Sequence, residues 1–75
     1  MAEPRVRIEI AFDGGQVLAA FVPEQAASEL ERALGEGGDG SFALDAEDGR
    51  YTVSLRRVVY VKRFTREARV GFTPA

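Results

Sequence analysis

GRYTVSLRRVVYVKRF, residues 49–64, is the longest run of strand-forming residues in the chain and holds half of its ten Lys and Arg residues. In its first half Tyr51, Val53 and Leu55 alternate with polar residues, which predicts a strand with one buried face. The alternation slips at Arg56 and Arg57, where we expect a tight turn or a bulge. The stretch therefore predicts two successive strands that join at the paired arginines.

The second of these strands is apolar on both faces. Its side chains divide into two sets, with Val59 and Val61 on one face and Val58, Tyr60, Lys62 and Phe64 on the other. A domain with a single helix does not need two apolar faces on one strand for its own core. We therefore expect a partner to dock on this strand.

Two further strands are predicted before the helix. Residues 6–12 alternate between apolar and polar side chains, as in a strand with one buried face. Asp13, Gly14 and Gly15 form a strong turn signal, because Asp and Gly tolerate positive φ. Residues 16–22 then carry apolar side chains on both faces, so this strand is either buried on both sides or half covered by an element that packs later. Together the two segments predict a hairpin.

A helix is predicted to begin at Pro23 and to end just before Gly35. Pro23 suits the first helical position, where its missing N–H costs nothing. Ala and Leu then recur at 3.6-residue spacing and give the helix one apolar face. Gly35 is the expected C-cap. The glycine-rich segment 35–40 follows a helix C-terminus and lacks the sequence of a phosphate-binding loop, so we interpret it as a connector.

These elements, with a short strand at Ser41–Ala46, give the order β-β-α-β-β-β. Such an order predicts a single small α+β domain over residues 1–75, with a mostly antiparallel sheet and one helix packed on one face. We expect the three strands between residues 41 and 64 to form a meander. Ala68–Phe72 is predicted as a last short strand.

The composition excludes several classes of site. The chain has no Cys and no His, so disulfides, thiol nucleophiles, structural zinc sites and His-based triads are ruled out. The acidic turn at residues 47–49 lacks the spacing of a calcium loop. No Ser has a base to activate it, and a chain of 75 residues rarely encloses a catalytic cleft. We therefore predict a protein that is not an enzyme and uses no cofactor and no metal.

The sequence also bears on location. No apolar run approaches the ~20 residues that cross a bilayer. The N-terminal residues MAEPRVR lack the apolar core of a signal peptide. We expect a cytoplasmic protein without a membrane partner.

Charge is unevenly distributed along the chain. Residues 1–49 hold three cations and eleven carboxylates, whereas residues 50–75 hold seven cations and one carboxylate. We favour intramolecular neutralisation as the explanation; a self-complementary association surface and a nucleic-acid face are the other interpretations. The candidate binding surface consists of the basic residues of the C-terminal third, namely Arg56, Arg57, Lys62, Arg63 and Arg66.

Two functions are considered for this surface. The first is self-association as a homodimer, or binding of a protein partner, through a sheet edge or face, since a small sheet leaves backbone groups unpaired at its edges. The alternative is a single-stranded RNA or DNA binder, because cations beside aromatic rings on a sheet are typical of such proteins. That alternative uses Arg56, Arg57, Lys62 and Arg63. A sequence pI of about 5.0 favours the first function.

The order of the segments VRIEI (6–10), SELERAL (28–34), SFALDAEDGR (41–50), VVYVKR (58–63) and ARVGF (68–72) resembles a family of short actinobacterial proteins of unknown function. Members of that family read VKIGI near the start, then a Glu-rich helix, LLTLTDEKGRR, IAYVEI and RRVGFG. The chain departs from them at Lys62 and Arg63, where the family has Glu-Ile, and after the Gly49-Arg50 turn, where the family's Val-Pro is missing. Some members are labelled ATP-binding, but this chain spells no phosphate-binding motif, so the resemblance carries no site residues over.

Overall fold

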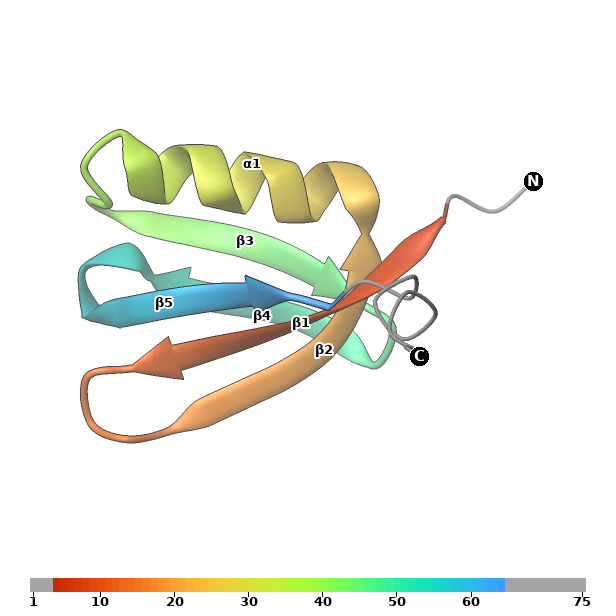
Figure 1. The fold of residues 1–75 in the computed structure, drawn as a ribbon, viewed down its shortest axis with the longest axis horizontal. Helices are drawn as coiled ribbons and strands as arrows, with labels where there is room; N and C mark the ends of the chain where they lie inside the picture. The colour runs from red at the N-terminus through yellow and green to blue at the C-terminus, as the bar shows by residue number, and fades with distance from the viewer. Residues whose placement is uncertain (1–3, 65–75) are drawn as a thin grey trace, which may run out of the picture.

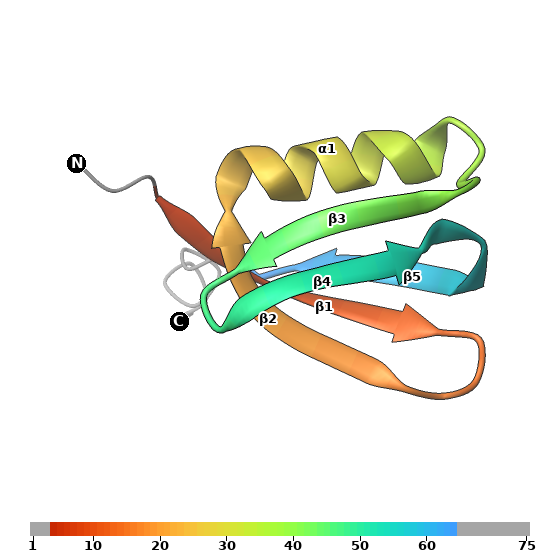
Figure 2. The ribbon, with the colours of Figure 1, turned by 180° about the vertical axis from the view of Figure 1, so that it is seen from behind.

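The computed structural model describes residues 4–64, and Figures 1 and 2 show the fold from two opposite sides. Within these residues, five strands in antiparallel sheets and one helix form a small compact α+β domain, so the predicted fold class and the order β-β-α-β-β-β are confirmed. The last strand predicted at Ala68–Phe72 lies outside the described residues. The elements are β1 (Arg5–Phe12), β2 (Val17–Pro23), α1 (Glu24–Gly35), β3 (Ser41–Ala46), β4 (Gly49–Ser54), a 3-10 turn (Leu55–Arg57) and β5 (Val58–Arg63).

The strands form two antiparallel sheets. β2, β1 and β5 make a three-stranded sheet in that order, and β3 and β4 make a two-stranded sheet. The predicted meander of β3, β4 and β5 is wrong, because β5 pairs with β1 and not with β4. The physical reason lies at the 3-10 turn, where the side chain of Leu55 is buried. By burying Leu55, this turn carries the chain from one sheet to the other across the core.

One hydrophobic core lies between the two sheets and α1. The helix runs alongside β3 (Figure 1) and presents its buried face to this core. The turn between β3 and β4 is tied to β2 by the N–H of Glu47, which donates to the carbonyl of Phe21 at 3.0 Å. The fully buried side chains of the core are Ile8, Ile10, Val22, Ala27, Leu30 and Leu44.

The helix begins and ends one residue later than the sequence pattern predicts. Pro23 is the last residue of β2 and precedes the helix, with φ −59° and ψ 145°. Gly35 is still helical, and the chain turns away at Gly37, where φ is 122°. The N–H groups of Gly37 and Gly38 donate to carbonyls of the last helical turn at 3.3 and 3.1 Å, as in a Schellman motif. Gly37 rather than Gly35 therefore supplies the conformation that favours glycine.

A β-bulge determines which side chains of β5 face the core. Val61 pairs with the fully buried Ile10 and faces the core with it. The register between the two strands shifts after Ala11, and Val59 is the extra residue on the β5 side. Val59 is 64% exposed, and Val58 packs against the core instead. The prediction that Val59 and Val61 lie on one face of the strand is therefore wrong, because the bulge interrupts the alternation.

Candidate binding surface

The basic residues predicted as a binding surface do not lie on one surface. Arg56 and Arg57 belong to the 3-10 turn. Lys62 points away from the core, opposite Glu9 of β1, whereas Arg63 points toward the core side and is largely covered. Arg66 lies outside the described residues.

Ion pairs join the acidic and the basic parts of the chain. Each of the three pairs in the described range links a cation from residues 50–63 to a carboxylate from residues 1–49. Intramolecular neutralisation, the favoured interpretation, therefore accounts for three of the cations. The pairs are Arg50 with Asp45 at 2.8 Å, Arg57 with Asp13 at 3.3 Å and Arg63 with Glu31 at 3.2 Å.

A different set of side chains gathers on the side of the three-stranded sheet that faces away from the core. Because side chains alternate along a strand, the residues between the core positions of β1, β2 and β5 point outward. α1 packs on the core side, so no element within residues 4–64 covers this surface. We call it the outer face; it comprises Arg5, Arg7, Glu9, Ala11, Val17, Ala19, Phe21, Tyr60, Lys62 and, just after β5, Phe64.

The strand register arranges most of the outer face in three rows. Side chains that lie directly opposite each other on one face of an antiparallel pair are in contact distance. The first row is apolar, the second carries two opposite charges, and the third has an aromatic ring on each side of a cation. The rows place Ala11 between Val17 and Tyr60, Glu9 between Ala19 and Lys62, and Arg7 between Phe21 and Phe64.

The outer face exposes large apolar side chains next to cations. Val17, Phe21 and Tyr60 are 54%, 47% and 47% exposed, and they are three of the four large hydrophobic side chains that the described chain exposes. Arg7 Cζ and Lys62 Nζ lie 4.4 and 4.5 Å from the centre of the ring of Phe64, within the range of cation–π attraction. Exposed apolar groups rimmed by polar ones mark interaction surfaces. The outer face is therefore the candidate site.

The side chain of Arg63 covers the C-terminal end of the free edge of β5. Among the strands of residues 4–64, this strand has one neighbour, β1. Arg63 reaches across to α1, where its Nε lies 3.2 Å from Glu31 Oε2 and its terminal nitrogen 3.1 Å from Ser28 Oγ. Only 24% of the Arg63 side chain is exposed. Because inward-pointing charges keep edge strands from pairing, Arg63 protects the C-terminal end of this edge, and the outer face is better placed for the association of two copies.

On the hairpin of β3 and β4, hydrogen bonds shift the pKa values of two side chains, the half-buried Tyr51 and the exposed Arg50. Tyr51 donates to Asp48 Oδ2 at 2.7 Å, and this bond raises the pKa of the Tyr51 phenol. The bond from Arg50 to Asp45 likewise raises the pKa of Arg50. These bonds hold a turn together and suggest no chemistry.

Among residues 4–64 no cluster of acids could hold a metal ion, and α1 is too short and too polar to cross a membrane.

Two features of the sequence point toward the outer face, namely the apolar residues on both sides of β5 and those on both sides of β2. Residues 16–22 are apolar on both sides, and the structure shows the half-covered alternative, with Ala20 and Val22 buried and Val17 and Phe21 exposed. The sequence does not predict Arg7 as a site residue, because nothing local shows that β1 lies between β2 and β5.

Comparison with known proteins adds no family to this description. No protein-family model, no curated protein and no solved structure matches the chain. The resemblance to a family of short actinobacterial proteins therefore stays a prediction.

Proposed function

We propose that the protein is a small, cytoplasmic, non-catalytic binding module that associates with a second copy of itself through the outer face. The observation that carries this proposal is the exposure of Val17, Phe21 and Tyr60 on a side of the sheet that no element within residues 4–64 covers. Burial of apolar surface is the dominant favourable term in most protein association. A second copy supplies a matching set of apolar side chains.

The charges of the outer face suit a symmetric dimer. Glu9 lies in the middle row, directly opposite Lys62 and two residues from Arg7 on the same strand. A two-fold axis brings the same patch of both copies together, so that a residue of one copy meets a different residue of the other and the reverse. Glu9 of each copy can then pair with a cation of the other. Such pairing offsets the cost of removing these charges from water.

The size of the outer face predicts a weak dimer. β1 and β2 are paired over seven residues, and the sheet is three strands wide. At roughly 3.3 Å per residue and 4.8 Å per strand, the face covers on the order of 300 Å² in projection. Stable interfaces bury about 800 Å² per partner. We therefore expect association that depends strongly on concentration, with a Kd roughly between micromolar and millimolar.

Sedimentation velocity over a concentration series tests the proposal. The wild type should shift from the 8.2 kDa monomer toward a dimer as its concentration rises. Ala19→Arg should remove this shift, because it puts a cation at the centre of the outer face, where the same cation of the second copy repels it. Ala43→Arg is the matched control, since Ala43 is an exposed strand alanine of the other sheet. A monomer at every concentration, or equal losses in both variants, contradicts the proposal.

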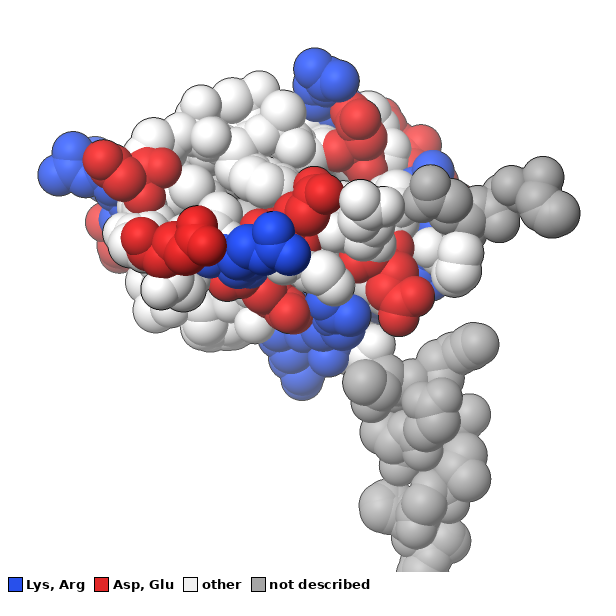
Figure 3. All heavy atoms as spheres, turned by 90° about the horizontal axis from the view of Figure 1, so that it is seen from above, with Lys and Arg blue, Asp and Glu red and all other residues white. Residues whose placement is uncertain are grey.

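Single-stranded nucleic acid is the second candidate ligand of the outer face. The face combines three cations and three aromatic rings with one carboxylate, which is the combination that single-stranded binding uses. The exposed charges of α1 are mostly carboxylates, and Figure 3 shows both signs mixed on that side of the molecule. Phosphates would therefore approach the sheet side. The residues concerned are Arg5, Arg7, Lys62, Phe21, Tyr60 and Phe64, a different set from the one that the sequence predicts.

A fluorescence titration with a single-stranded oligonucleotide tests this second candidate. Binding at about 50 mM salt should weaken steeply at about 200 mM, because cations that contact phosphates release bound counterions. Arg7→Gln should lower the affinity and reduce the salt dependence. Absence of binding at the lower salt concentration rules this candidate out and leaves self-association standing.

A further inference from the structure

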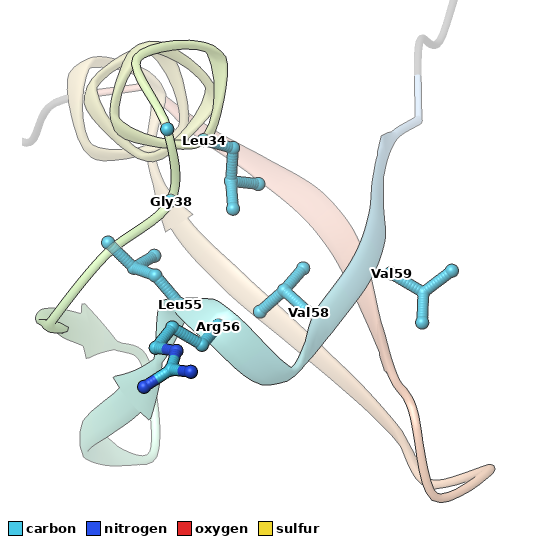
Figure 4. A pocket seen from close by; sticks show the side chains of 7 residues that line it. Leu34, Gly38, Leu55, Arg56, Val58 and Val59 are labelled. Carbon is cyan, nitrogen blue, oxygen red and sulfur yellow. The ribbon is translucent and has the colours of Figure 1, made fainter.

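A groove separates the C-terminal end of α1 from the start of β5 (Figure 4). Its volume is about 390 Å³, within the range of ordinary ligand pockets, about 300–1,000 Å³. Leu34 of α1 and Val58 of β5 point into it, Leu55 of the 3-10 turn lies at its base, and Val59 lies at its rim. Two glycines that follow α1 complete the lining. Most of the side chains that line the groove are apolar, whereas polar atoms make up most of its exposed surface, and the groove is separate from the outer face.

The edge of β5 beside this groove offers backbone groups that can pair with another strand. The N–H of Phe64 donates to the carbonyl of Arg7 at 2.9 Å, which gives the phase of the ladder between β1 and β5. In an antiparallel ladder alternate residues turn their N–H and C=O groups toward the partner. Lys62 and Tyr60 thus pair with β1, and Val61 turns its groups the other way. In the described range no strand lies on that side of β5, and no backbone bond reaches Val61 from it.

One charged side chain lines the groove. Arg56 is exposed and takes part in none of the ion pairs within residues 4–64. Its neighbour Arg57 is held by Asp13 and is absent from the groove lining. A guanidinium presents a rigid fork of donors that matches a carboxylate. The groove therefore combines an apolar floor, an open strand edge and an anion-binding group.

We propose that this groove binds an extended peptide segment that carries an acidic residue close to an apolar one. The peptide adds to the edge of β5 as a strand, a recognised mode of peptide binding in which backbone bonds supply affinity and side-chain pockets supply selectivity. Its apolar side chain enters between Leu34 and Val58, and its carboxylate binds Arg56.

The occupant is a single strand and not β5 of a second copy. α1 forms the far wall of the groove, and the bonds from Arg63 to Glu31 and Ser28 span the space between β5 and α1 beyond it. A second copy would bring its whole three-stranded sheet into this space. Self-association and peptide binding therefore use different surfaces.

Selection from a displayed library of random linear octapeptides, with the wild-type protein immobilised, tests the proposal. The retained peptides should share alternating β-branched or Leu residues with at least one Asp or Glu, and they should lack Pro along the paired segment, because Pro cannot donate to the ladder. A synthetic peptide with the retained sequence should bind about tenfold more weakly to Arg56→Gln, the loss expected for one charge-assisted hydrogen bond. Arg50→Gln is the matched control, since it also neutralises an exposed arginine, and it should bind as the wild type does.

Two further measurements separate this proposal from self-association. Ala19→Arg should bind the peptide with unchanged affinity, because the outer face takes no part. In an amide correlation spectrum, the peptide should shift the signals of Val59 and Val61 and protect the Val61 amide from exchange. Retained peptides without an acidic residue, equal affinity for Arg56→Gln and the wild type, or shifts confined to the outer face would each overturn the proposal, as would a selection that retains nothing.

Discussion

Two valines of β5 should respond differently to the same substitution. Val61 faces the core opposite the fully buried Ile10, whereas Val59 is the bulge residue and 64% exposed. Replacement by alanine removes two methyl groups at either position and lowers the strand preference by a similar amount. The difference between the two variants therefore isolates the effect of burial.

The magnitude follows from the environment of each side chain. A fully buried methylene-sized group contributes about 0.8 kcal/mol. Val61 is half-buried, so the loss of two such groups, with a small cavity, should lower the free energy of unfolding by about 1–1.5 kcal/mol. Val59→Ala should change it by less than about 0.5 kcal/mol. A difference of about 1 kcal/mol corresponds to roughly 4–8 °C in Tm for a domain of this size.

Urea unfolding followed by circular dichroism, at a protein concentration low enough to keep the protein monomeric, measures both free energies. The dependence of the free energy on urea should be the same for both variants, because they unfold the same surface. Equal losses in the two variants, or a larger loss for Val59→Ala, would refute the bulge and the phase of β5.

Three other predictions concern the core, the edge and the exposed hairpin. Leu30→Ala, which empties a fully buried position of α1, should cost about 2–5 kcal/mol out of a total of roughly 4–11 kcal/mol, visible as a large fall in Tm; a fall no larger than that of an exposed site would contradict the core assignment. Arg63→Met should change stability by about 1 kcal/mol or less but raise light scattering, because the edge of β5 loses its guard; unchanged scattering at high concentration would argue against that role. In a Tyr60→Phe background, the phenol of Tyr51 should titrate above its ordinary pKa of 10.0, and Asp48→Asn should bring it back toward that value, as followed by phenolate absorbance. Because the folded-state pKa is raised, the stabilisation from this phenol is present below pH 10.0 and is lost as the pH rises through the raised value; a titration unaffected by Asp48→Asn would exclude the hydrogen bond as the cause.

The elements that the sequence predicts well are those that depend on neighbouring residues. Both hairpins follow from local turn signals, at residues 13–15 and 47–49, and the slip at Arg56 and Arg57 is the 3-10 turn of the structure. The partner of β5 is a non-local choice. Alternation shows that Val61 needs a buried face, but it does not say whether β4 or β1 provides the neighbouring strand. The helix begins one residue later than predicted because Pro23 still pairs with Arg5 as the last residue of β2. It ends one residue later because several glycines follow each other, and the hydrogen bonds select Gly37.

The candidate site depends even more on contacts between residues that are far apart in the sequence, and such contacts cannot be predicted from local patterns. The predicted basic surface is divided because Arg57 and Arg63 are held by carboxylates 44 and 32 residues away in the chain. The outer face, by contrast, joins side chains from three strands, and only the pairing of β1 with both neighbours brings Phe21 and Tyr60 onto one surface. No local pattern in a single sequence shows that β1 pairs with both β2 and β5. What it does show is the surplus of apolar residues in β2 and β5, which is the cause of the exposed surface.

The most direct test of self-association through the outer face is a series of amide correlation spectra recorded as the labelled protein is diluted. The signals of Val17, Ala19, Phe21 and Tyr60 should shift with concentration and follow one binding curve. Signals of the exposed strand residues of β3 and β4 should stay in place over the same range. Spectra that do not change with concentration, or shifts that appear on β3 and β4 instead, would contradict the account.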